Sequence, residues 1–109
     1  FFKAIVYMEV ENYKDFQKAD TLWKEMISHR KQKNYASSVF MNYLVLLNRE
    51  WAEADREDED NIAYLEKQTD WIINIIEQEE IEKWGKETKE EYCYLVIQNR
   101  KLQGKEFLQ

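Results

Sequence analysis

The scarcity of glycine and proline is the feature that most constrains what this chain can fold into. Its 109 residues contain two Gly and no Pro. Sheet sandwiches and barrels need a turn about every 8–12 residues, and such turns are built mostly from Gly, Pro, Asn and Asp. An all-β fold is therefore all but excluded. A Gly-rich phosphate-binding loop is excluded as well, because Gly85 and Gly104 stand alone.

Apolar residues at helical spacing dominate the chain instead. Over 36–51 they recur at i, i+3, i+4, i+7 and i+11, and further apolar residues fill the other faces of the same segment. A helix that is apolar nearly all round is usually the central, buried one. We therefore expect 36–51 to be the core helix, with Asn34 as its N-cap. Its main face consists of Phe40, Tyr43, Leu44, Leu47 and Trp51.

The segments before this helix also favour helices. Asn12 or Asp15 is suited to cap a helix that runs to about Gln32. Apolar residues occupy every second position from Phe2 to Val10, as in a strand, but a lone strand would need a partner strand elsewhere in the chain. We therefore expect helix there too.

An acidic loop over 55–61 separates the core helix from the next one. Asp58, Asp60 or Asn61 is suited to cap a helix that ends near Trp84. Gly85 then follows as the residue after its C-cap, where a left-handed backbone is common.

The last segment carries conflicting signals. Residues 92–97 have high β propensity. Thr88 and Glu91, however, have the spacing of a capping box, and Arg100 precedes Gly104 as expected at a helix C-terminus. These boundary signals favour a helix over about 88–103.

Together these segments predict an all-α fold. We expect one domain over residues 1–109, a compact bundle of four or five antiparallel helices joined by short loops. The alternative is an α+β fold in which 2–10 and 92–98 pair as a small sheet. No apolar run approaches the roughly 20 residues that span a bilayer, so we expect no membrane contact. The single unpaired Cys and the lack of an N-glycosylation sequon favour an intracellular protein, and we expect it in the cytoplasm.

Charge is distributed unevenly along the chain. The net charge is −6. Residues 1–49 carry eight Lys or Arg against five Asp or Glu, whereas residues 50–109 carry eight against seventeen. A nucleic-acid binder should present a basic surface, so direct nucleic-acid binding is disfavoured. The acidic half suits solvated helix surface or a face for a basic partner.

Two acidic patterns have the spacing of metal sites. The segment 55–66 has the register of a calcium-binding EF-hand loop, but Asp60 stands where that loop needs Gly. Glu50 and Glu53 lie on one helix face, as paired Mg²⁺ ligands do, but the acidic pairs that would face them (Glu77 with Glu80, or Glu66 with Asp70) are imperfectly spaced. We therefore expect no metal and no cofactor.

The single His and single Cys leave little room for catalysis. One of each excludes paired-His metal sites and disulfide frameworks. We expect His29 at the surface and Cys93 as a buried structural thiol. No arrangement of Ser, Asp or Cys supplies a nucleophile with a base, so we expect a protein that is not an enzyme.

The number of aromatic side chains is the best functional clue. Sixteen of the residues are Phe, Trp or Tyr, more than a small bundle is expected to bury. Those off the main stripes are Tyr7, Tyr13, Trp71, Trp84 and Tyr94. Exposed aromatic rings mark protein interfaces. We therefore expect a non-catalytic adaptor or regulator that binds another protein, or a second copy of itself as a homodimer.

The partner-binding surface is expected to combine aromatic and acidic residues, namely Trp71, Trp84, Tyr94, Glu50, Glu53, Asp55, Glu57, Asp58, Glu59 and Asp60. The alternative function is an acidic inhibitor that mimics nucleic acid and blocks a nucleic-acid-binding enzyme, as small phage or mobile-element proteins do. A metal-dependent all-α hydrolase is a less favoured third reading.

Overall fold

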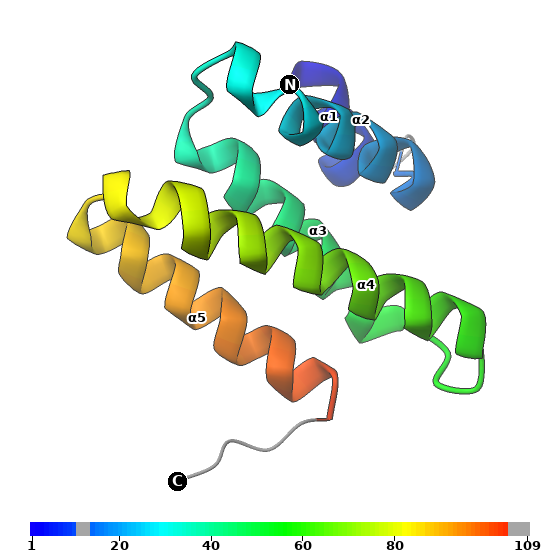
Figure 1. Cartoon of the computed structure of the whole chain (residues 1–109). Coiled ribbons are helices and arrows are strands. Elements are labelled where there is room, and N and C mark those ends of the chain that lie inside the picture. Colours follow the sequence, from blue (N-terminus) through cyan, green and yellow to red (C-terminus); the bar gives the residue numbers. More distant parts are fainter. Residues whose placement is uncertain (11–13, 105–109) are drawn as a thin grey trace, which may run out of the picture. The chain divides into compact units, whose positions relative to one another are not determined.

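The described part of the chain consists of helices joined by short loops. The computed structural model describes residues 1–10 and 14–104, and no strand occurs in these ranges. Its α-helices are α1 (Phe2–Glu9), α2 (Phe16–Ser28), α3 (Ser37–Glu53), α4 (Glu59–Ile75) and α5 (Lys86–Leu102), shown in Figure 1. The predicted all-α class is confirmed. The alternative sheet is wrong, because 2–9 and 92–98 are both helical.

Several predicted boundaries are confirmed by their backbone contacts. The Asp15 side chain caps α2 by accepting from the Lys18 backbone N–H at 3.1 Å. Asp58 caps α4 in the same way through the Asn61 N–H, also at 3.1 Å. Gly104 follows α5 with φ of 79°, the left-handed backbone that glycine adopts at no steric cost. The competing cap Asn12, like Tyr13, lies outside the described residues.

Three boundary predictions are wrong. Asn34 does not cap α3, which begins only at Ser37. Gly85 has φ of −72° and ψ of 170°, so it is extended and serves as the N-cap of α5 instead of ending the preceding helix in a left-handed turn. Because α5 begins at Lys86, Thr88 already lies inside the helix and cannot form a capping box.

The chain is organised as two compact units. Residues 1–46 form the first and residues 47–109 the second, so α3 contributes to both. Each unit has buried apolar side chains of its own. The expectation of a single domain stays a prediction.

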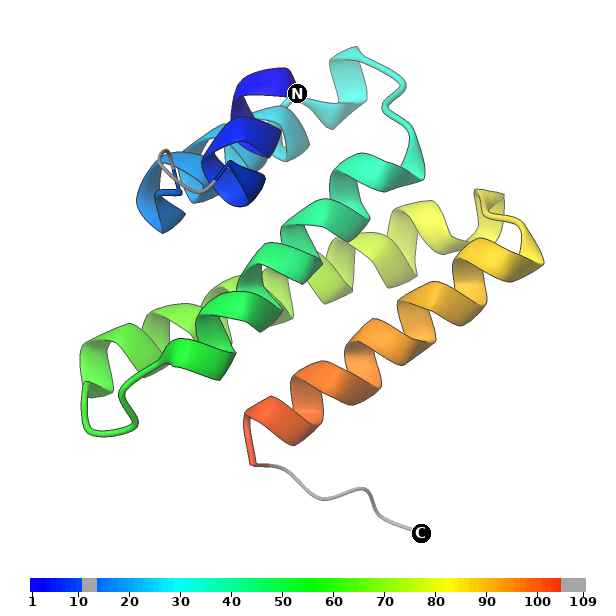
Figure 2. The ribbon, with the colours of Figure 1, turned by 180° about the vertical axis from the view of Figure 1, so that it is seen from behind.

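The first unit is built on α1 packed along α2 (Figures 1 and 2). The fully buried Trp23 of α2 donates its indole N–H to the Met8 sulfur at 2.9 Å. The first part of α3 adds Tyr43, whose hydroxyl donates to the buried Asp20 carboxylate at 2.5 Å. Both polar pairs are satisfied within the apolar interior, so they do not carry the cost of unpaired buried groups.

The second unit comprises the end of α3, then α4 and α5. Figure 1 shows α4 and α5 side by side and antiparallel, joined through the short segment 76–85. That segment is a π-helical turn, Ile76–Glu80, followed by a 3₁₀ turn, Ile81–Lys83. Fully or nearly fully buried side chains fill the interior, among them Leu47, Trp51, Leu65, Ile72, Ile76 and Leu95.

Burial along α3 matches the expectation for a core helix. The five residues of its predicted main face are all at most 1% exposed. Val39, Met41 and Leu46, on other faces, are buried as well. No helix in residues 1–10 or 14–104 is long and apolar enough to cross a membrane.

Candidate functional site

The outer side of α5 carries exposed apolar side chains next to one another. Tyr94 is 63% exposed and Ile97, one turn further along, is 43% exposed. Cys93 is exposed beside them. We call these three residues the α5 outer face. The prediction that Cys93 is a buried structural thiol is wrong, because one residue along a helix turns the side chain by about 100° from the buried Tyr92.

The opposite side of α5 is fixed inside the unit by polar contacts with α3. Asn99, which is 1% exposed, donates its side-chain N–H to the Asn48 side-chain oxygen at 2.8 Å. Asn48 in turn donates to the Leu95 backbone oxygen at 3.1 Å. These directional bonds set the rotation of α5, so Tyr94 and Ile97 point to solvent.

Tyr92 joins α5 to the turn that follows α4. Its hydroxyl donates to the Glu77 carboxylate at 2.8 Å, and the Trp84 ring contacts its ring edge-on with centroids 6.0 Å apart. Burial, and then the hydrogen bond to Glu77, raises the pKa of the Tyr92 hydroxyl far above its ordinary value of about 10. The neutral phenol is therefore the form that the fold favours.

This contact predicts an alkaline loss of stability. Above about pH 10 the unfolded chain releases the Tyr92 proton while the folded chain keeps it, so the free energy of unfolding falls as the pH rises. Tyr92→Phe should make this fall shallower in urea titrations between pH 9 and about pH 11. Tyr94→Phe is the control, since it removes an exposed hydroxyl. Equal slopes for the two variants would contradict the role of Tyr92.

The three predicted aromatic residues do not form one continuous patch. Trp84 is half-buried and contacts Tyr92, on the inner side of α5. Tyr94 lies two positions after Tyr92, about 200° around the helix, and is therefore on the outer side. Trp71 is half-buried on α4. Of the other expected excess aromatics, Tyr7 is half-buried beneath the Lys18 ammonium, 5.4 Å from its ring centre.

Most of the predicted acidic residues are exposed around the connection of α3 to α4. We call Glu53, Asp55, Glu57, Asp58, Glu59 and Asp60 the acidic turn, and all six are exposed. Glu50 is half-buried on α3. Two of the acidic turn's carboxylates also organise its backbone, because Asp58 caps α4 and Asp55 accepts from the Glu57 N–H at 2.9 Å.

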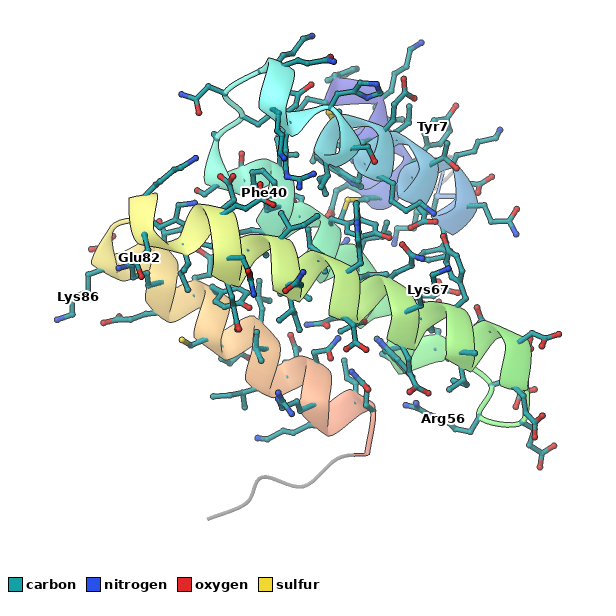
Figure 3. All side chains as sticks on the ribbon, in the orientation of Figure 1. Tyr7, Phe40, Arg56, Lys67, Glu82 and Lys86 are labelled. Atoms are coloured by element: carbon teal, nitrogen blue, oxygen red, sulfur yellow. The ribbon has the colours of Figure 1, made fainter. Side chains whose placement is uncertain are left out.

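Arg56 is the single basic residue between Glu50 and Asp60, and its side chain reaches the ends of two helices. Its guanidinium donates to the backbone oxygens of Trp51, near the end of α3, and of Leu102, the last residue of α5. It also lies 5.4 Å from the Trp51 ring centre. Figure 3 shows Arg56 near the connection of α3 to α4. A cation at helix C-termini is favourable, because the last carbonyls there lack helical partners. The guanidinium is therefore engaged by backbone oxygens at the base of the acidic turn.

Neither metal pattern gathers its ligands. Within residues 1–10 and 14–104, no group of three or more His, Cys, Asp or Glu side chains is placed to hold an ion. An EF-hand loop over 55–66 would need irregular backbone, but α4 already begins at Glu59. His29 is at the surface as predicted, with its Nδ1 2.8 Å from the Glu25 backbone oxygen.

Sequence reasoning missed several exposed apolar residues. Ile97 lies one turn from Tyr94, off the inner stripe of α5, and a helical projection of that segment would have found it. Phe2, Phe1 and Val10 are 78%, 56% and 43% exposed. Their exposure has no comparable signal, because the apolar period of residues 1–11 is ambiguous.

Comparisons with protein-family models, with curated proteins and with solved structures find no match to this chain.

Proposed function

We propose that this chain is a non-catalytic protein-interaction module, an adaptor or regulator that binds a protein partner through the α5 outer face. The supporting observation is the pairing of Tyr94 and Ile97, two large apolar side chains held side by side in solvent on a helix whose other face is fixed. Tyr is enriched among the residues that dominate binding energy at interfaces. The acidic turn belongs to the same unit and adds negative charge that favours a partner with a basic rim.

A second copy of the chain is the simplest such partner. The α5 outer face of one copy against that of another would give a two-fold symmetric contact, in which the same residues meet from both sides. Apolar burial would then drive association, with little dependence on salt.

The test combines sedimentation with affinity capture from the source cell. Tyr94→Ser and Ile97→Ser should each weaken self-association or partner capture by at least about tenfold, the effect of about 1.4 kcal/mol. Val10→Ser is the matched control, since Val10 follows α1, is 43% exposed like Ile97, and does not belong to the α5 outer face. The proposal would be contradicted if the chain is a monomer at every concentration and the captured partner binds both α5 variants as strongly as wild type.

The acidic inhibitor stays as the second candidate, because the whole acidic turn is exposed and Arg56 is engaged at the helix ends. Such an inhibitor presents carboxylates in place of phosphates, so its affinity should fall steeply with ionic strength. Binding through the α5 outer face should respond weakly to salt. Neutralising the exposed Glu57 and Glu59 to Gln would abolish only the first mode.

A further inference from the structure

The first unit contains a groove that the proposed function does not use. Its volume is about 540 Å³, within the usual range for ligand sites, and it runs between the start of α1 and the end of α2. Apolar side chains line much of its wall, including Phe2, Met26 and Tyr35. Phe2 is 78% exposed, so a large apolar surface is open to solvent here.

Basic side chains from two distant segments meet at this groove. Lys3 comes from α1, whereas His29 and Lys33 flank the 3₁₀ turn Arg30–Gln32 that follows α2. Lys3 and Lys33 are both exposed, and Glu25 is the acidic residue among the described side chains of the wall. The basic cluster that the sequence carries over 29–33 thus lies beside an apolar surface.

We propose that this groove binds an acidic, amphipathic segment of a partner protein. Apolar side chains of that segment would enter between Phe2, Met26 and Tyr35, and its carboxylates would meet the ammonium groups of Lys3 and Lys33. Amphipathic helices bind apolar grooves in this way, through anchors spaced one turn apart. The charges provide orientation and speed of association more than affinity.

Two observations favour an acidic peptide over other occupants. The described residues that line the groove include lysines but no arginine, so the wall lacks the planar, two-pronged donors typical of dedicated phosphate sites. The wall also combines large apolar side chains with charged ones. A small anion would contact the charges but leave the apolar side chains exposed to water. The groove lies in the first unit and is independent of the α5 outer face.

The probe is a fluorescein-labelled synthetic peptide, EEFEDLLEEFED, whose Phe and Leu residues share one helical face. Polarisation titrations use the full chain. Lys3→Glu combined with Lys33→Glu should weaken binding by at least about tenfold. Phe2→Ser should weaken it as well. Lys31→Glu is the matched control, because Lys31 belongs to the same 3₁₀ turn and is exposed but does not line the groove.

Each outcome supports or overturns the proposal. A selective loss in the Lys3, Lys33 and Phe2 variants, with Lys31→Glu and Tyr94→Ser close to wild type, supports it. Equal loss in Lys31→Glu and Lys33→Glu would show general attraction of charge and would overturn it. The proposal would also be overturned if a peptide with Ser at the Phe and Leu positions binds as well as the original peptide. Binding to phosphatidylserine vesicles but not to the peptide would overturn it too. Because Tyr94→Ser tests the other surface, failure here leaves the proposed function standing.

Discussion

Leu47→Ala is expected to lower the free energy of unfolding by roughly 2–5 kcal/mol, the range for truncating a fully buried leucine. Leu47 is 0% exposed on α3. Its truncation removes apolar burial and leaves a cavity that the close-packed interior fills only in part. The measurement is the midpoint of urea unfolding, with the slope of the transition expected to stay constant.

Glu53→Ala serves as the control for this prediction. Glu53 is the last residue of the same helix and is exposed, so its change should lie within about 0.5 kcal/mol of wild type. A midpoint for Leu47→Ala that matches the control would show that Leu47 lies outside the core. A result in the expected range would confirm that α3 contributes a buried face to the interior.

Asn99→Leu is expected to cost roughly 1–3 kcal/mol although it replaces a polar residue by an apolar one of similar size. The substitution removes the side-chain N–H that donates to the Asn48 oxygen. Because Asn48 is buried, its oxygen then loses this hydrogen bond without gaining one from water. An unpaired buried acceptor carries its full desolvation penalty. Urea unfolding of the variant measures the loss.

The double variant Asn48→Leu with Asn99→Leu separates this cause from a packing effect. It removes both partners, so it should be less destabilised than the sum of the two single variants. The Leu95 oxygen loses the Asn48 donor but remains within the regular helix α5. Strict additivity of the two single losses would contradict a specific pairing of Asn48 with Asn99.

Local patterns in the sequence were sufficient to predict most of the fold. The central helix follows from apolar spacing, and the caps Asp15, Asp58 and Gly104 follow from their chemistry at segment ends. These signals succeed because each depends on residues within a turn or two of one another. The helix over residues 1–11 is expected only because a lone strand would have no partner. Asn34 and Thr88 have equally good cap chemistry, but α3 begins at Ser37 and α5 begins at Lys86, so neither residue stands at a helix start.

The α5 outer face and the groove were harder to predict from the sequence than the helices. Whether Tyr94 faces solvent while Tyr92 is buried depends on the rotation of α5. That rotation is set by Asn48, which is far from α5 along the chain. The groove depends in the same way on Lys3 and Lys33 meeting across α1 and α2. Contacts between distant segments leave no periodic signal in a single sequence.

The position of α3 across both units has a consequence for how the molecule comes apart. The border between Leu46 and Leu47 falls within the helix, with no linker, and backbone bonds there span four residues across it. Opening one unit alone would require a new helix end among buried side chains, with carbonyls and amides stripped of their partners. Proteases that need extended substrate should therefore find no cleavage site at this border in the native protein, and neither half is a natural fragment for separate expression.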